Sequence, residues 1–414
     1  MGGNLTGSIT ATQFKSLPCC GGTIFVGLNN APIDCSDTPI VYGVTGNIHV
    51  GTMPHNSRIF LYTSLGADLT IDECNGGIIT VYGFVKDTAT VTIGNMAKSE
   101  TWEPDIDFGV SSDSASCDIA GDLVFSNGIP ADSSIELFGA QGANSSIDMN
   151  SGGVGGTLTL WSGGAGTITN GGTVASGGTV TLADTHANQD REFSGTATFG
   201  AVSSGGKINT TGGTYDGELS GTLNITNTMA GDIDLGGTFS GVIDIGSDLN
   251  GDATFSRPFT GDLQIGGDVS GDIDVTGDVT ATGSIDIGGG LRGRILVDGV
   301  CDGDINIDEG STSVALIHIE DGFDGSILTG TDLGSYAFAG DMLFGPASSP
   351  SLPDYSFLGC VDIDGSLDGD IDVVACLDVD PAICVQGDTN GTITLTQTGC
   401  TPTYVLDSSC PTCP

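Results

Sequence analysis

Aspartates at a regular spacing are the residues of this chain most suited to chemistry. Between residues 231 and 310 the sequence repeats in units of ten, and aspartates recur at the second and fourth positions of these units. Calcium binds several oxygen ligands at once, so stacked carboxylates suit a calcium site. The candidate ligands are Asp232, Asp234, Asp252, Asp272, Asp274 and Asp304. The alternative is a solvated acidic face whose side chains stagger to reduce their repulsion.

No motif in the sequence predicts a catalytic residue. The acidic stretches 302–310 and 362–372 lack glycine at the position that an EF-hand calcium loop requires. Any acidic face contains pairs of carboxylates of the kind that glycosidases use, so such pairs do not indicate an enzyme. Arg257, Arg292 and Arg294 form a small basic cluster, which we interpret as surface charges that relieve acidic repulsion.

Two further features are weaker candidates for a binding site. An insertion at 183–194 interrupts the repeat and contains His186 and Arg191, and loops on a rigid scaffold often carry function. A plain polar loop is the favoured interpretation. Trp102 and Trp161 are candidate platforms on which a sugar ring could stack. The four histidines are scattered and predict no shared site.

Composition excludes several classes of partner. The 414 residues include 52 acids but only 9 lysines and arginines, which gives a formal net charge of -43. This charge repels phosphate backbones and anionic lipids, so we expect no binding to nucleic acid. No segment approaches the roughly 20 apolar residues needed to span a bilayer, so we expect no membrane insertion.

The ten-residue repeat predicts short β-strands. In the unit that begins at Gly231, apolar residues stand at Ile233, Leu235 and Phe239, and the intervening positions are mostly polar. Alternation with a period of two is typical of a strand with one buried face. We therefore expect the third, fifth and ninth positions to face inward. We expect the glycines to adopt the positive φ angles of sharp corners.

The repeat predicts an all-β, parallel β-solenoid, because self-similarity at a fixed period extends over nearly the whole chain. An antiparallel sandwich or propeller is the alternative. The likeness of the segments at 231 and 261 favours three units per coil, whereas the match of Phe239 with Phe259 favours two; we predict three faces. The expected organisation is an N-terminal cap with first coils at 1–45, a solenoid rod at 46–345, and cysteine-rich coils with a cap at 346–414.

This periodicity resembles the broad class of right-handed parallel β-helices. That class contains secreted adhesins, viral tailspikes, polysaccharide lyases and glycosidases, and cytoskeletal bactofilins. The resemblance covers nearly the whole chain but includes no family motif, so no functional residue is carried over from it.

Twelve cysteines indicate disulfides formed in an oxidising compartment. The disulfide candidates are Cys19, Cys20, Cys35, Cys74, Cys360, Cys376, Cys384, Cys400, Cys410 and Cys413. Cys301 stands at an inward position and is predicted to be a buried free thiol. The N-terminus lacks the basic start and apolar run of a signal peptide. This favours a removed leader, an excised part or export by another route, such as inside a virus particle.

Together these features predict a structural or adhesive protein that is extracellular or on a cell or virion surface. We expect a rigid acidic rod that assembles with copies of itself into a surface layer, fibre or filament, with a glycan as a further candidate partner. Calcium is the one expected cofactor. The alternative is a β-helix enzyme that processes polysaccharides, or a glycan-binding viral tailspike or fibre.

Overall fold

The structure is a computed structural model in which the described residues form strands but no helix. It describes residues 8–13, 23–26, 43–54, 57–62, 64–97, 104–109, 118–183, 192–210, 217–329, 338–344, 360–363, 366–375, 382–385 and 389–397. The chain divides into two compact units, residues 1–224 and 225–414, which are described separately below. Within these described ranges, no helix is long and apolar enough to cross a membrane.

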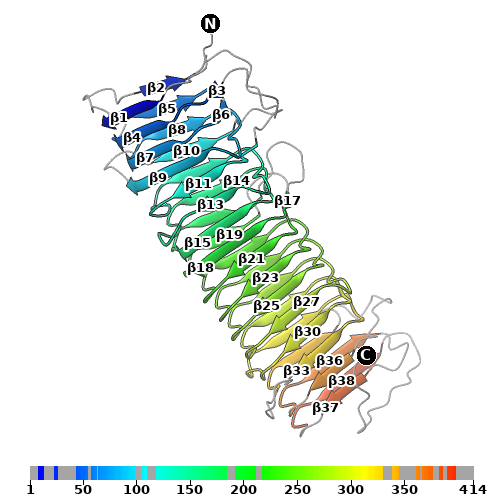
Figure 1. Ribbon diagram of the computed structural model, residues 1–414. Coiled ribbons are helices and arrows are strands. Elements are labelled where there is room, and N and C mark those ends of the chain that lie inside the picture. Colours follow the sequence, from blue (N-terminus) through cyan, green and yellow to red (C-terminus); the bar gives the residue numbers. More distant parts are fainter. Residues whose placement is uncertain are drawn as a thin grey trace. The chain divides into compact units, whose positions relative to one another are not determined.

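Unit 1 is built from two parallel sheets, 1A and 1B (Figure 1). Sheet 1A contains, in spatial order, β1 (Ile9–Gln13), β4 (Ile48–Met53), β7 (Leu69–Asn75), β9 (Thr90–Ala97), β11 (Asp122–Phe125), β13 (Ser146–Asp148), β15 (Thr167–Val174) and β18 (Thr196–Val202). Sheet 1B contains β2 (Thr23–Val26), β5 (Arg58–Leu61), β8 (Ile78–Val81), β10 (Asp105–Phe108), β12 (Ser134–Leu137), β14 (Thr157–Leu160), β16 (Thr179–Thr181) and β19 (Lys207–Asn209). Two short parallel pairs lie at the sides, β3 (Gly43–Val44) with β6 (Ser64–Leu65) and β17 (Glu192–Phe193) with β20 (Glu218–Leu219). Strand β21 (Thr222–Ile225) spans the boundary between the units.

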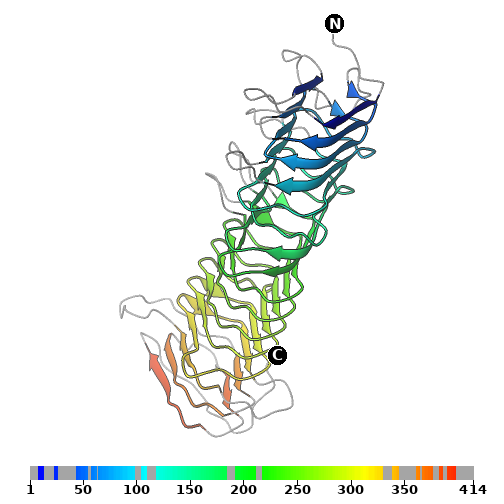
Figure 2. The same ribbon diagram turned by 90° about the vertical axis from the view of Figure 1, so that its left-hand side faces the viewer.

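Unit 2 repeats this plan with parallel sheets 2A and 2B (Figure 2). Sheet 2A contains β23 (Val242–Ile245), β25 (Asp262–Ile265), β27 (Ser284–Ile287), β30 (Asp304–Ile307), β33 (Ser326–Thr329), β35 (Cys360–Ile363) and β37 (Ala382–Val385). Sheet 2B contains β22 (Asp232–Leu235), β24 (Ala253–Phe255), β26 (Ile273–Val275), β28 (Arg294–Val297), β31 (Leu316–Ile319), β34 (Asp341–Phe344), β36 (Ile371–Ala375) and β38 (Ile393–Gln397). A short pair, β29 (Val300–Cys301) with β32 (Gly322–Phe323), lies at one side. Each unit is therefore a parallel β-solenoid, as the repeat predicts.

One coil of unit 2 contains two ten-residue repeats, so the prediction of three faces is wrong. Ile233 pairs with Ala253 and Ile243 pairs with Leu263, each twenty residues further along the chain. The chain thus returns to the same sheet after two strands. The ninth positions form bridges at the narrow sides of the coil, and Phe239 bridges to Phe259 as the aromatic match indicates.

The inward positions form a continuous apolar core, which confirms the expected strand pattern. In the unit that opens at Gly231, Ile233 and Leu235 are each 1% exposed, and Phe239 is fully buried. The rings of Phe239, Phe255 and Phe259 meet at centroid distances of 4.8–5.4 Å in tilted and edge-to-face arrangements. Such arrangements are favourable for aromatic rings. Because every coil places side chains at the same inward positions, the core continues from one coil to the next.

Most glycines that open the repeats of unit 2 are required for close packing between coils, and not for the positive φ angles that we expected. Positive φ angles occur at glycines of unit 1, such as Gly177 and Gly205, but at none among the described residues of unit 2. In unit 2 the constraint is close approach between coils. A Cβ atom on Gly251 would lie 1.9 Å from the carbonyl oxygen of Gly231, and one on Gly271 would lie 1.9 Å from that of Gly251. No side chain fits at that distance.

The glycine column predicts that Gly271→Ala destabilises unit 2. The added methyl group meets backbone rather than a movable side chain, so neighbouring coils must shift, at a cost of about 1–3 kcal/mol or more. Urea-induced unfolding measures this loss. Gly142→Ala in unit 1 is the control, because its Cβ would lie 3.3 Å from the nearest atom, the Cα of Ala120. Equal losses in the two variants would contradict the role of close approach.

Candidate functional site

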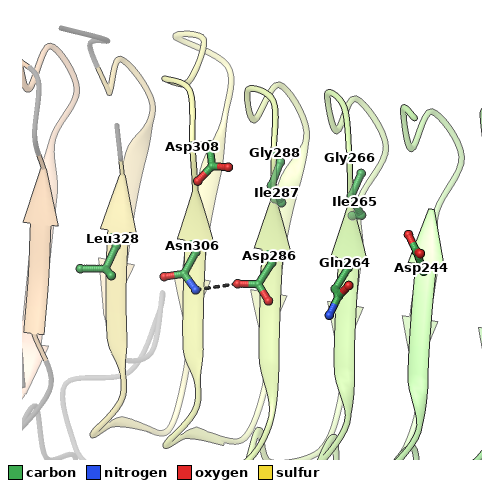
Figure 3. A pocket seen from close by; sticks show the side chains of 10 residues that line it. All are labelled: Asp244, Gln264, Ile265, Gly266, Asp286, Ile287, Gly288, Asn306, Asp308 and Leu328. Atoms are coloured by element: carbon green, nitrogen blue, oxygen red, sulfur yellow. Dashed lines mark hydrogen bonds between the residues drawn. The ribbon is translucent and has the colours of Figure 1, made fainter. Parts of the chain in front are cut away.

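A groove on the outer face of sheet 2A is the candidate functional site of unit 2 (Figure 3). Its volume is about 520 Å³. The polar and apolar side chains along it are Asp244, Gln264, Asp286, Asn306, Asp308 and Leu328. They come from strands β23 to β33 and the corner after β30, so five successive coils contribute to one surface.

Two parallel rows shape the groove. The first row consists of outward side chains in the middle of successive strands, and the second lies just beyond the strand ends (Figure 3). The second row is lined by Gly266 and Gly288, where a Cβ would lie 3.0 Å and 3.1 Å from the carbonyl oxygens of Gly246 and Gly266. These glycines leave open space beside the first row. Asp308 occupies the next position of the second row (Figure 3).

Carboxylates and amides alternate along the first row. Asp244 pairs in register with Gln264, which pairs with Asp286, which pairs with Asn306. The Asn306 side chain donates a hydrogen bond of 2.6 Å from Nδ2 to Oδ1 of Asp286 (Figure 3). Since neighbouring strands lie about 4.8 Å apart, an amide between two acids separates charges that would otherwise be directly opposite.

The acids of sheet 2A also alternate between rows. Asp262 and Asp304 stand two residues earlier in their strands than Asp286 does in its own. At that position Ser284 lies between them in register, and Ser326 follows Asp304. The Ser284 hydroxyl lies 3.3 Å from Oδ1 of Asp262 and 2.9 Å from Oδ2 of Asp286. Ser326 donates a 2.5 Å hydrogen bond to Asp304. This pattern agrees with the interpretation of a staggered acidic face.

The groove is chemically a row of hydrogen-bonding groups. It presents carboxylate acceptors and amide donors at the spacing of the coils, and its lining residues include no histidine, cysteine, lysine or arginine. Such a surface suits an extended polar polymer whose groups repeat along its length. Its lining supplies carboxylates as the only titratable groups.

The acids predicted to bind calcium lie mainly on sheet 2B, where Asp232, Asp252 and Asp272 accept backbone hydrogen bonds. Oδ1 of Asp232 accepts from the N–H of Asp252 at 3.2 Å, and Oδ1 of Asp252 accepts from the N–H of Asp272 at 2.9 Å. In sheet 2A the equivalent N–H of Asp262 donates to the carbonyl oxygen of Gly241. On sheet 2B the carboxylate therefore replaces a backbone acceptor next to the glycine. This accounts for the acids that follow the glycine on sheet 2B.

The predicted calcium ligands do not converge on one point. Asp304 lies on sheet 2A, whereas Asp234 and Asp274 lie on sheet 2B with Thr254 between them in register. Burial raises the pKa of Asp274, and the charge of Asp272 adds to the effect. In the described part of the chain, no group of three or more histidine, cysteine or acidic side chains is arranged to hold a metal ion. Calcium binding stays a prediction.

Two arginines relieve acidic repulsion, as the sequence indicates. Arg292 forms an ion pair with Asp268, with Nη2 and Oδ2 2.5 Å apart. Arg294 contacts Oδ2 of Asp272 through Nη2 and through Nε, the latter at 3.1 Å. The hydrogen bond from Arg294 lowers the pKa of Asp272, and its positive charge acts in the same direction. The arginines are exposed and the aspartates half-buried, so each pair lies at the surface and contributes little to stability individually.

The two cysteines whose side chains are described are buried free thiols. This confirms the prediction for Cys301 and corrects that for Cys74, which is not in a disulfide. Cys74 lies in β7 between Met53 and Met96 of the adjacent strands, so its surroundings are apolar. Burial raises the pKa of the Cys74 thiol to about 11 and that of Cys301 to about 12.

The other disulfide candidates lie outside the residues or side chains that the structure describes. The backbones of Cys360 and Cys384 belong to β35 and β37, but their side chains are not described. The candidates wholly outside the described residues are Cys19, Cys20, Cys35, Cys376, Cys400, Cys410 and Cys413. Their pairing stays a prediction.

The remaining sequence candidates are only partly described. Residues 184–191 of the insertion and Trp102 lie outside the described residues. Trp161 is half-buried and stacks on Phe138, with the ring centroids 5.8 Å apart and the planes 5° from parallel. His49 contacts Asp72 of the adjacent strand at 3.0 Å.

Sequence reasoning missed a group of three carboxyl side chains on sheet 1B of unit 1. Asp105 and Asp107 belong to β10, and Glu136 of β12 lies directly opposite Asp107. The sequence does show acids at the outward positions of β10 and β12. Their pairing was not readable, because 29 residues separate Asp107 from Glu136 and the coils of unit 1 differ in length.

The backbone hydrogen bond to Asp252 predicts different effects for two substitutions. Asp252→Ala removes the acceptor for the Asp272 N–H, so we expect a loss of about 0.5–1.5 kcal/mol in the free energy of unfolding. Asp252→Asn keeps an oxygen acceptor and removes one repelling charge, so we expect a smaller loss or none. Urea unfolding and amide hydrogen exchange at Asp272 measure the difference. Identical behaviour of both variants would show that the carboxylate is not the acceptor.

A comparison with known proteins finds no relative for this chain. No family model matches it, and neither does any curated protein or solved structure. Its function is therefore inferred from its own geometry.

Proposed function

We propose that the chain is an extracellular structural or adhesive protein that assembles with copies of itself through the ends of its β-sheets. The main support is the set of strands that, among the described residues, have a partner on one side only. In sheets 2A and 2B of unit 2, the strands at the C-terminal end with one partner are β37, paired with β35, and β38, paired with β36. Unpaired strand edges present backbone donors and acceptors that can pair with a strand of another chain.

The inward side chains at this end of unit 2 support the proposal. Ile371 in β36 is fully buried, whereas its register partner Ile393 in β38 is only half-buried. Val361 in β35 is likewise fully buried, and its partner Ile383 in β37 is half-buried. Covering these residues with a further coil would remove apolar surface from water, which is favourable at about 25 cal/mol per Å².

Charge and cysteine content support the location and set a condition for assembly. A net charge of -43 opposes contact between copies, and salts or divalent cations at a cell surface reduce that repulsion. The cysteine-rich C-terminal segment suits an oxidising environment. Both features fit an exported protein better than a protein of a reducing compartment.

The groove of sheet 2A supports the adhesive part of the proposal. Its alternating carboxylates and amides offer hydrogen bonds to a neutral glycan, whose hydroxyl groups both donate and accept. An anionic glycan would be repelled by Asp244, Asp286 and Asp308.

Electron microscopy and light scattering of the purified chain test the assembly. We expect fibres, layers or end-to-end oligomers at high protein concentration. Thr394→Glu places a charge in β38, where Thr394 is exposed, and we expect it to reduce assembly. Thr312→Glu makes the same change at an exposed corner away from the strand edges and is the matched control. A monomer at every concentration, or equal assembly of both variants, would contradict the proposal.

The acidic columns predict that calcium stabilises the folded chain. We expect millimolar calcium to raise the melting temperature more than sodium at matched ionic strength, because a divalent ion bound only to the folded state stabilises it. The gain should shrink when Asp252→Asn and Asp274→Asn are combined, since the charge of Asp252 acts on Asp274. Equal melting curves in the two salts would indicate screening alone.

A further inference from the structure

The carboxyl cluster of sheet 1B differs in burial from Asp232 and Asp252 of unit 2, which stand opposite one another in adjacent coils but are exposed. Asp107 in β10 and Glu136 in β12 are register partners on adjacent strands, and Asp105 stands two residues before Asp107 on the same outward face. Adjacent parallel strands are about 4.8 Å apart, so these side chains are close neighbours. All three are half-buried. Like charges directly opposite one another in a sheet are destabilising.

The neighbouring strands offer this cluster hydroxyl and apolar groups. On one side, Ile78 and Thr80 of β8 lie opposite Asp105 and Asp107. On the other side, Thr157 and Thr159 of β14 lie opposite Ser134 and Glu136. The threonine hydroxyls of this face are neutral and cannot balance the charge of the carboxylates.

The described basic side chains of the same sheet lie further away. Arg58 is in β5, which β8 separates from β10, and Lys207 is in β19, which lies three strands beyond β12. The described residues of sheet 1B therefore place no cation on a strand adjacent to the cluster. A proton is the smallest cation that can reduce its charge.

The cluster holds a proton more tightly than separate carboxyl groups would. Burial raises the pKa of Asp107 to about 7, and the charges of Asp105 and Glu136 add to this effect. Burial also raises the pKa of Asp105, with a further contribution from Glu136. Tyr82 is affected in the same sense, since burial, its contacts with Tyr62 and the charge of Asp107 all raise its pKa.

Glu136 connects the cluster to aromatic side chains. Nε1 of Trp161 donates a 3.2 Å hydrogen bond to Oε2 of Glu136, and the Trp161 ring stacks on Phe138. Tyr62 and Tyr82 form a second stack, with their ring centroids 4.6 Å apart. A change in the charge of the cluster therefore acts directly on the surroundings of Trp161.

We propose that Asp105, Asp107 and Glu136 form a pH-sensitive switch in unit 1, in which a bound proton stabilises the outer face of sheet 1B and its release loosens the contact between Glu136 and Trp161. This inference is independent of self-assembly, because it concerns a single coil stack. In the unfolded chain the carboxyl group of Asp107 titrates near pH 4. The folded state binds the proton more tightly, so the stabilisation is complete below about pH 4 and is lost as the pH rises through about 7.

Tryptophan fluorescence tests the switch, because the chain has only two tryptophans. In a Trp102→Phe background, Trp161 is the sole tryptophan, and we expect its emission to titrate with a midpoint near pH 7. Asp107→Asn should abolish this transition. Asp87→Asn, at an exposed turn of unit 1, is the matched control and should retain it.

A second variant keeps the test decisive if Asp107→Asn does not fold. Glu136→Gln removes one charge beside Asp107 while keeping an oxygen that can accept from Trp161, so we expect the midpoint to fall. The melting temperature of the parent should decrease between pH 5 and pH 8 more than that of either variant. A parent midpoint below pH 5, or a midpoint that Glu136→Gln leaves unchanged, would overturn the proposal. Monomeric protein at low concentration is used, so the outcome is independent of assembly.

Discussion

The close stacking of successive coils is the constraint on which the rest of the structure depends. In unit 2 the backbone of one coil approaches the next so closely that a Cβ on Gly271 would meet the Gly251 carbonyl oxygen at 1.9 Å. The same stacking places every inward side chain beside its equivalent in the neighbouring coil. The core is therefore continuous, and a residue such as Phe239 packs against Phe259 twenty residues later.

Stacking also brings like charges together, and the chain reduces their repulsion in several ways. On sheet 2A, acids alternate with amides and serines; for example, the Asn306 amide donates a hydrogen bond to the neighbouring Asp286. On sheet 2B, a carboxylate such as that of Asp252 accepts a backbone N–H of the next coil, so the charge interacts with the dipole of the peptide group. Arginines in later coils, such as Arg294, form ion pairs with further aspartates and neutralise their charge.

The cluster at Asp107 differs because Asp107 and Glu136 are opposite one another and half-buried, although the Ser134 hydroxyl, 3.5 Å from Oε1 of Glu136, stands opposite Asp105 as the serines of sheet 2A stand opposite their acids. Its acids are opposite one another, half-buried, and bordered by threonines and aromatic rings. A raised pKa is the physical consequence, since the cost of keeping charges together falls when one carboxyl group is protonated. Asp232 and Asp252 of unit 2 also stand opposite one another, but they are exposed and a backbone hydrogen bond joins them. This contrast is the reason to assign the cluster a role.

The local sequence by itself determined which residues form strands and which of their side chains face the core. Ile233, Leu235, Phe239 and Cys301 are buried as the repeat predicts, because alternation along a strand decides the direction of each side chain regardless of distant residues. The recurrence of one pattern at equal spacing likewise indicated a parallel solenoid. These properties depend on residues only a few positions apart, so they can be predicted from the sequence.

Only the tertiary structure decided the number of strands per coil, the reason for the glycines and the pairing of the acids. Two sequence matches favoured different coil lengths, and the register between coils was needed to choose the one that joins Phe239 to Phe259. The pairing of Asp107 with Glu136 depends on the length of every corner between β10 and β12. This register depends on the total number of residues in all corners of a coil and on how the core of that coil packs. A local pattern of apolar and polar residues does not reveal this total. The sequence alone therefore determined neither the length of the coil nor the pairing of the carboxyl groups.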